Sequence, residues 1–130
     1  MVSITSKSPY ALKALVELAL MEDAEPVPVA ELARRRDLPA QFLEQLFGTL
    51  RRAGILVSQR GVKGGYRFAR SPETVTVLEL VELMDGPFGV EADGIFREAV
   101  DAARERLAAQ TIADLAEAER REAGAPMYHI

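Results

Sequence analysis

Cysteine and tryptophan are absent from this 130-residue sequence, and histidine occurs once. Without cysteine, the chain forms no disulfide and holds no iron–sulfur cluster or zinc ion through thiolates. No hydrophobic run approaches the roughly 20 residues that span a bilayer, and the N-terminal residues do not have the pattern of a signal peptide. Because 48% of the residues are hydrophobic, we expect a folded chain, and we predict a cytoplasmic protein.

Few side chains offer catalytic or metal-binding chemistry. The one histidine, His129, stands near the C-terminus, and no nucleophile–base pair is recognisable, so we predict no enzymatic activity. Glu91 and Asp93 lie close together in a predicted loop, but two carboxylates are fewer ligands than a closed metal site requires. We therefore expect no metal site and no other cofactor.

Charge is distributed unevenly along the chain. Residues 1–70 carry 11 basic and 7 acidic side chains, whereas residues 71–130 carry 5 basic and 13 acidic ones. Nine of the basic residues lie between Arg34 and Arg70. This split indicates that the first half meets a polyanion, with two solvated faces of a mixed surface as the alternative.

Hydrophobic periodicity predicts a mostly α-helical protein with one β-hairpin. Ser8 is the expected N-cap of the first helix, with Pro9 at the first helical position. This helix is apolar on nearly every side, so it must be covered on more than one face, which a second subunit could do. The expected helices are residues 8–22, 29–36, 39–53, 76–84, 94–108 and 111–122.

The second and third predicted helices are separated only by the turn Asp37-Leu38, a spacing that suits a helix-turn-helix motif. One face of the third helix is apolar and consists of Leu43, Leu46, Phe47 and Leu50. The opposite face is polar and consists of Gln41, Glu44, Gln45, Gly48 and Arg52. A DNA-recognition helix is built in this way, and an ordinary amphipathic surface helix is the alternative.

A β-hairpin is predicted directly after the third helix, where a winged helix-turn-helix protein has its wing. Its strands are residues 55–59 and 66–69, joined by a glycine-rich turn that contains Arg60 and Lys63. Arg67 follows close behind. The glycine spacing does not match a nucleotide-binding loop, and no helix follows at once, so a phosphate-cradling loop is the weaker interpretation.

Two capping-box pairs mark the start of helices in the second half of the chain: Thr76 with Glu79, and Thr111 with Asp114. In each pair we expect the threonine hydroxyl to accept a hydrogen bond from the backbone N–H three residues on, while the acidic side chain reaches back.

Residues 94–108 carry an apolar stripe with helical spacing. The stripe consists of Phe96, Ala99, Val100, Ala103 and Leu107. We expect it to pack against the same helix of a second subunit, with folding back onto its own domain as the alternative. The predicted domains are residues 1–87, a winged helix-turn-helix DNA-binding domain, and residues 88–130, with the connecting loop, the dimerisation helix and a C-terminal helix.

Five motifs carry a resemblance to one known family. They are Thr5-Ser6-Lys7-x-x-Tyr10-Ala11, Phe42-Leu43-Glu44-Gln45-Leu46-Phe47, Leu50-Arg51-x-Ala53-Gly54, Arg60-Gly61-x-Lys63-Gly64-Gly65-Tyr66 and Thr111-Ile112-Ala113-Asp114-Leu115. In this order they resemble the Rrf-two (Rrf2) family of winged helix-turn-helix transcription regulators, over about residues 4–117. The family includes iron–sulfur cluster regulators and nitric-oxide-sensing repressors, and this chain resembles a cysteine-free member.

The resemblance implies a homodimeric transcription regulator, expected to be a repressor, that binds an imperfect palindrome in double-stranded DNA. The residues predicted to read bases are Gln41, Glu44, Gln45 and Arg60. Those predicted to contact the DNA backbone are Ser6, Lys7, Tyr10, Arg51, Arg52, Lys63, Tyr66 and Arg67. By its chemistry, Glu44 can accept from a cytosine amino group, the glutamines can pair with adenine, and Arg60 suits a minor groove.

The chain departs from the family in the loop before the dimerisation helix. Members that sense iron–sulfur status or nitric oxide carry three cysteines there, whereas residues 86–94 contain none, which excludes that chemistry. Two other ways of regulating DNA binding stay open. One is a protein partner on the acidic C-terminal half, and the other is a small molecule held between the first, fourth and dimerisation helices. The side chains suggested for that pocket, which serve equally well as core, are Leu83, Met84, Phe88 and Phe96.

Overall fold

The computed structural model describes residues 7–21 and 25–124, so that predictions for Ser6 and His129 lie outside the described residues. The predicted mostly helical fold with one hairpin is confirmed. The elements are α1 (Lys7–Leu20), α2 (Val29–Arg36), α3 (Ala40–Arg52), β1 (Leu56–Gln59), β2 (Gly65–Phe68), the 3-10 turn η1 (Pro72–Thr74), α4 (Val77–Asp85), α5 (Gly94–Ala108) and α6 (Ile112–Ala123).

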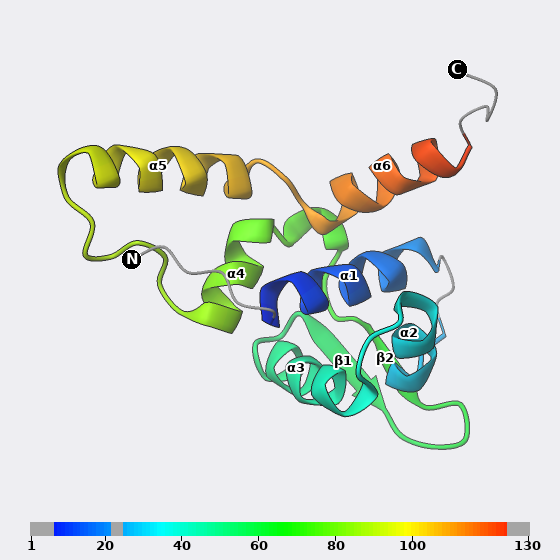
Figure 1. The fold of residues 1–130 in the computed structure, drawn as a ribbon. Helices are drawn as coiled ribbons and strands as arrows, with labels where there is room; N and C mark the ends of the chain where they lie inside the picture. Colours follow the sequence, from blue (N-terminus) through cyan, green and yellow to red (C-terminus); the bar gives the residue numbers. More distant parts are fainter. Residues whose placement is uncertain (1–6, 22–24, 125–130) are drawn as a thin grey trace.

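Helix α1 occupies the centre of the fold (Figure 1). It packs against α2 and α3 on one side, against α4, and against α6 on the other side. Its apolar side chains on several faces, among them Ala11, Leu15 and Leu18, are buried as a result. The cover over α1 thus comes from within the chain, where the sequence suggested a second subunit.

Ser8 is not the N-cap that the sequence predicts. It lies inside α1, which includes Lys7, and it is only 3% exposed. A buried hydroxyl needs a hydrogen-bond partner, and that of Ser8 donates to the carboxylate of Asp85 at the end of α4. Because Asp85 is 77 residues away in sequence, local pattern gave no sign of this role.

The helix-turn-helix prediction holds closely for α2 and α3. Asp37 ends α2 in the left-handed conformation, with φ of 54°, and the chain turns there toward α3. The predicted inner face of α3 is confirmed, since its four apolar residues, Leu43, Leu46, Phe47 and Leu50, are all buried. The polar face of the helix therefore points away from the core.

The wing pairs antiparallel, with Leu56 opposite Phe68, one residue from the predicted strand starts. The start of β2 is tied to the segment before α2 by two backbone hydrogen bonds between Val27 and Tyr66, each 2.8 Å long. Gly65 makes this approach possible, because a Cβ there would lie 2.3 Å from the carbonyl carbon of Val27. The wing is thereby held against the helix-turn-helix.

The two capping boxes differ in outcome. At α6 the prediction is confirmed: Thr111 and Asp114 exchange both hydrogen bonds. At α4 only half forms, since the Thr76 hydroxyl accepts from the backbone N–H of Glu79 at 3.1 Å. The Glu79 carboxylate pairs with Arg70 instead of reaching back, because a guanidinium is the stronger partner.

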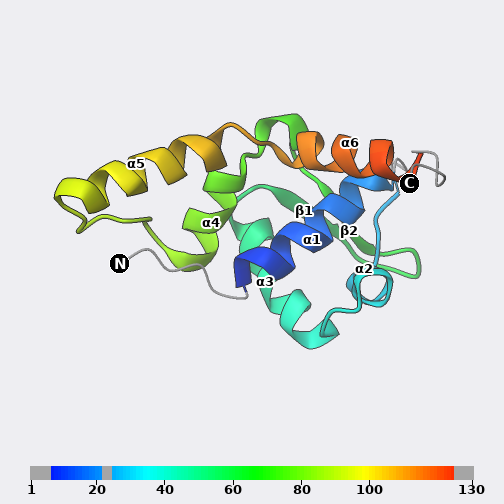
Figure 2. The same ribbon diagram turned by 45° about the horizontal axis from the view of Figure 1, so that its top comes forward.

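The C-terminal helices relate differently to the body. Helix α6 packs into the main hydrophobic core, together with α1 to α4, through Ile112 and Ala116. Helix α5 projects away from these helices (Figure 2). Val100 of α5 packs in a smaller cluster with residues of α4 and the following loop. The domain boundary between residues 87 and 88 stays a prediction. No helix in the described ranges is long and apolar enough to cross a membrane.

Candidate nucleic-acid interface

The outward face of α3 presents polar side chains to solvent. Gln41, Glu44 and Gln45 are all exposed, near the start of the helix, while the opposite face is buried. Amide and carboxylate groups offer donors and acceptors that match base edges in a major groove. The structure thus places three of the four predicted base-reading residues on one accessible surface, and the fourth, Arg60, is exposed on the wing.

Four of the nine basic residues between Arg34 and Arg70 are neutralised within the chain. Arg34 and Arg35 pair with Glu31, at 2.6 and 2.8 Å. Arg36 pairs with Glu17 of α1 and Glu119 of α6, and Arg70 pairs with Glu79. The hydrogen bonds from Arg34 and Arg35 lower the pKa of Glu31 to about 2. Arg36 and Arg70 therefore join separate elements of the fold, while the charges of Arg34 and Arg35 are offset by a carboxylate of their own helix.

The other five basic residues of this stretch are exposed and form no ion pair within the described part of the chain. They are Arg51, Arg52, Arg60, Lys63 and Arg67. They belong to the end of α3, to the turn of the wing and to β2. We name these five residues, with the polar face of α3, the α3–wing surface. Five unpaired cations next to one exposed carboxylate, Glu44, make it electropositive.

The two predicted tyrosines are partly engaged in packing. The rings of Tyr10 and Phe42 meet edge to face with centroids 5.7 Å apart, and those of Tyr66 and Phe47 do so at 5.2 Å. Tyr10 thus braces α1 against α3, and Tyr66 braces the wing against α3. Both are half-buried, so a hydroxyl contact with DNA stays a prediction, as does the contact of exposed Lys7.

Two residues of this surface escaped the sequence analysis. Val62 is fully exposed in the turn of the wing, between Arg60 and Lys63. Thr49 accepts a hydrogen bond from Arg52 on the outer side of α3. The signal for Val62 was present in the sequence, because an apolar residue inside a glycine-rich turn has no core to enter; that for Thr49 was not.

The predicted dimerisation stripe is divided in the structure. Val100 is only 2% exposed, buried by the chain's own α4 region, and Ala103 and Leu107 are half-buried. Phe96, at 72% exposed, and Ala99 face solvent. An apolar groove of about 730 Å³ runs along this side of α5, lined by Glu91, Ala92, Asp93, Phe96, Ala99, Val100 and Ala103. Ile95, also exposed, adds apolar surface that the stripe did not include.

Helix α5 is held at its angle by a polar contact as well. Arg104 donates to the Glu82 carboxylate of α4 at 2.8 Å, and this hydrogen bond lowers the pKa of Glu82. The same carboxylate accepts from the backbone N–H of Phe88 at 3.3 Å. These contacts fix the loop before α5, and with it the direction in which Phe96 projects.

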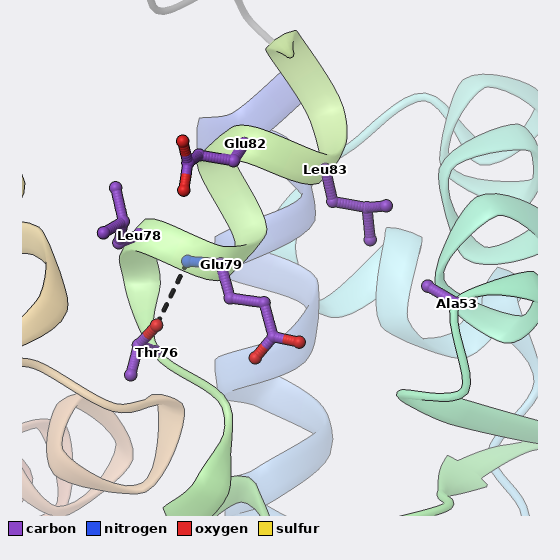
Figure 3. A pocket seen from close by; sticks show the side chains of 6 residues that line it. All are labelled: Ala53, Thr76, Leu78, Glu79, Glu82 and Leu83. Atoms are coloured by element: carbon purple, nitrogen blue, oxygen red, sulfur yellow. Dashed lines mark hydrogen bonds between the residues drawn. The ribbon is translucent and has the colours of Figure 1, made fainter. Parts of the chain in front are cut away.

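The four side chains suggested for a small-molecule pocket lie in different surroundings in the described part of the chain, so a site lined by all four is not supported, and control by a small molecule stays a prediction. Met84 and Phe88 are buried core residues, and Phe96 is exposed on α5. Leu83 lines a separate shallow groove of about 440 Å³ (Figure 3). The other residues that line it are Ala53, Thr76, Leu78, Glu79 and Glu82.

A smaller groove does lie between α1, α4, α5 and α6. It measures about 300 Å³ and is lined by Leu12, Val77, Arg106, Leu107, Gln110 and Leu115. It lies between helices that the sequence suggested for a ligand, but none of the four suggested side chains is among its lining residues.

The comparisons with known proteins point in one direction. The Rrf2 family model, described as iron-dependent transcriptional regulator, matches residues 4–118. The HTH-type transcriptional regulator IscR of Aliivibrio salmonicida is 39% identical over 82 residues, which are 63% of this chain and 49% of the relative. IscR of Cereibacter sphaeroides is 43% identical over 84 residues, 63% of this chain and 54% of the relative. The chain thus spans about half the length of the curated relatives it matches.

Solved structures agree over nearly the whole chain. CymR, the global cysteine regulator of B. subtilis, superposes with a TM-score of 0.81 at 30% identity, covering 90% of this chain and 98% of that one. IscR of T. potens superposes with a TM-score of 0.83 at 28% identity, covering 98% and 95%. The winged helix-turn-helix fold is therefore confirmed.

The family description names iron, and the residues of this chain do not fit an iron site of the thiolate kind. The sequence has no cysteine, and the described residues bring together no group of three or more histidine, aspartate or glutamate side chains. Glu91 and Asp93 both line the α5 groove without a third ligand.

Family, relatives and fold agree with one another and with the motifs in the sequence. The matched family and both named relatives are transcription regulators and not enzymes, as the sequence predicted. The match covers more than half of the chain, including α3, the wing and α5. The chain belongs to the Rrf2 family of transcriptional regulators.

Proposed function

We propose that this chain is a cytoplasmic, sequence-specific regulator that binds double-stranded DNA as a homodimer on a palindromic operator and represses transcription by occupying it. The single observation that carries the proposal is the α3–wing surface, which combines the exposed polar residues near the start of α3 with the cations that the fold leaves unpaired at the end of α3 and on the wing. Cations fix a protein on the phosphate backbone, and polar groups on a helix read base edges.

The division of roles follows from chemistry and position. Glu44, Gln41 and Gln45 lie on the face that would enter the major groove, so they read bases. Arg51 and Lys63 contact phosphates, and Arg60 of the wing enters the adjacent minor groove. A homodimer presents two such surfaces related by a two-fold axis, which explains a palindromic site.

The dimer contact in this proposal is the exposed part of the α5 stripe, Phe96 and Ala99, with Ile95 beside it. A large aromatic side chain at 72% exposure next to an apolar groove is an unusual surface for a protein without a partner. Control by a protein partner on the acidic C-terminal half stays a prediction.

The test is a salt titration of DNA binding with the purified chain and a mixed-sequence duplex. Affinity should fall by about a thousandfold or more between 50 and 200 mM salt if six to ten phosphates are contacted per dimer. Arg51→Ala should make the logarithmic slope shallower by about one per subunit.

Arg34→Ala is the matched control, since it removes the same charge from an arginine that Glu31 already neutralises. It should leave the slope as in the wild type. Weak binding that is insensitive to salt would contradict the proposal, as would equal slopes for the wild type and Arg51→Ala.

A further inference from the structure

Arg52 at the end of α3 is held by a chain of hydrogen bonds. Its Nη2 donates to the hydroxyl of Thr49 at 3.2 Å, and that hydroxyl donates to the backbone carbonyl of Gln45 at 3.4 Å. A threonine hydroxyl has one hydrogen to donate and lone pairs to accept with, so both bonds form together. The guanidinium therefore has a set position on the helix, although the side chain is exposed.

The position of the guanidinium is along the polar face of α3. A Cβ placed on Gly48 would lie 3.4 Å from Nη1 of Arg52, so the guanidinium rests beside the one position on this face without a side chain. Helical side chains lean toward the N-terminus, which brings a long arginine back over the preceding turn. The charge thus lies level with Gly48 and Thr49, on the side where Gln41 and Gln45 are exposed.

The distance along the helix fits a base-reading position. Seven residues separate Gln41 from Gly48, about 10 Å at 1.5 Å per residue, and this is close to three base-pair steps of about 3.4 Å. No acidic side chain among the described residues pairs with Arg52. Its free donors are therefore available to the groove.

We propose that Arg52 reads a guanine in the major groove, with Thr49 and Gly48 as the residues that position it. This rests on the proposed DNA-binding function and changes the role of Arg52, which the sequence alone placed on the phosphate backbone. A phosphate contact tolerates a mobile side chain, whereas base recognition needs a held one, and a guanidinium matches the N7 and O6 acceptors of guanine.

Arg51 offers a neighbour of the same chemistry without this support. It is exposed, and no side-chain hydrogen bond of Arg51 occurs in the part of the chain that the structure describes.

Bound sequences are selected from a random DNA pool for the wild type, Arg52→Ala and Arg51→Ala, and competing duplexes with single base changes then give relative affinities.

The wild type should require a guanine at one position of each half-site, with about 5- to 150-fold discrimination against other bases. Arg52→Ala should lose this preference and keep the others, whereas Arg51→Ala should bind every duplex more weakly by one factor. Arg52→Lys keeps the charge without the planar fork, so it should retain the salt slope of binding and lose the guanine preference. Thr49→Val should weaken the preference at the same position only.

The inference is wrong if Arg52→Ala weakens all duplexes alike, as a phosphate contact would, or leaves the selected sequence unchanged. In either case the proposed function stands. If the wild type selects no sequence at all, the proposed function fails, and this inference fails with it. The thermal midpoint of each variant checks that the substitution leaves the fold intact.

Discussion

Gly65 determines how the wing joins the rest of the molecule. Its φ of 154° and the close approach of Val27 leave no room for a side chain. The next residue, Tyr66, makes the two backbone hydrogen bonds to Val27 and packs its ring against Phe47. One missing Cβ therefore sets the position of the cations in the turn relative to α3.

We expect Gly65→Ala to destabilise the fold by about 1–3 kcal/mol or more, because strain and a clash with backbone add together. Gly61→Ala is the control, since Gly61 also has positive φ but open space around it, so it should cost less. Urea unfolding of both variants measures the difference. Equal losses would contradict the idea that the contact with Val27 matters.

Residue-level prediction from sequence succeeded where the partner was local. The Thr111–Asp114 capping box formed as expected because both members lie within one turn. The prediction for Ser8 was wrong because its partner, Asp85, is distant in sequence. The Glu79 carboxylate pairs with Arg70 and so does not complete the predicted capping box with Thr76. Short-range patterns therefore predict a cap well unless a charged or buried group from another element competes for it.

Helix α2 carries three consecutive arginines, which the charge distribution along the sequence assigns to a polyanion-binding surface. The fold brings Glu17 from α1 and Glu119 from α6 against them, and Glu31 lies one turn away within α2. Charge counts along a chain cannot show this, because two of the three partners come from other helices. The first and last residues of α2 and α5, in contrast, were predicted correctly, because turn residues and glycine next to these helices mark their ends.

Glu31 should make stability depend on pH. Its pKa is lowered from 4.5 to about 2 by Arg34 and Arg35, so its contribution is present above about pH 4.5 and is lost as the pH falls toward 2. We expect the thermal midpoint of the wild type to exceed that of Glu31→Gln near neutral pH, with the gap closing below pH 4.5.

Removing both arginine partners, as Arg34→Gln with Arg35→Gln, should abolish the same pH-dependent gap between glutamate and glutamine at position 31. A gap between the wild type and Glu31→Gln that stays constant from pH 5 to pH 2 would contradict this account of Glu31.

Arg36 joins the helix-turn-helix to the C-terminal helix. It makes two hydrogen bonds to Glu119, at 2.7 and 3.1 Å, and one to Glu17 at 2.8 Å. Because the arginine side chain is only 19% exposed, we expect a coupling energy of about 1 kcal/mol between Arg36 and Glu119, above that of an ordinary surface pair.

A double-mutant cycle with Arg36→Ala and Glu119→Ala, followed by urea unfolding, measures this coupling. The same cycle with Arg34 and Glu31, where the arginine is 69% exposed, should give a smaller value. A coupling near zero for Arg36 and Glu119 would show that this ion pair does not help to hold α6 against the helix-turn-helix.

The molecule as a whole separates two surfaces. Helix α3 and the wing lie on the lower side of Figure 1, whereas α5 lies beyond the opposite side of α1. Helix α5 carries the exposed apolar residues Ile95 and Phe96. Periodicity predicted that the five stripe residues share one side of α5, but periodicity does not say which neighbour buries a residue. Val100 packs within the chain because α4 reaches it, and Phe96 does not because the loop before α5 carries it outward.

We expect Phe96→Glu to raise the dissociation constant of the homodimer by roughly thirtyfold or more, the effect of losing a central aromatic anchor. Sedimentation velocity over a range of concentrations measures it. Val62→Glu places the same charge on another exposed apolar residue, in the wing, and should leave assembly unchanged. A Phe96→Glu protein that assembles as the wild type does would place the dimer contact elsewhere.

The central claim is that a symmetric dimer reads DNA through the α3–wing surface, and selection of bound sequences from a random duplex pool tests it most directly. We expect an enriched sequence made of two inverted half-sites, with centres one helical turn of about 10 base pairs or a multiple of it apart. Glu44→Ala should change the preferred base within each half-site. No enriched sequence, or a single half-site without its inverted copy, would contradict the account.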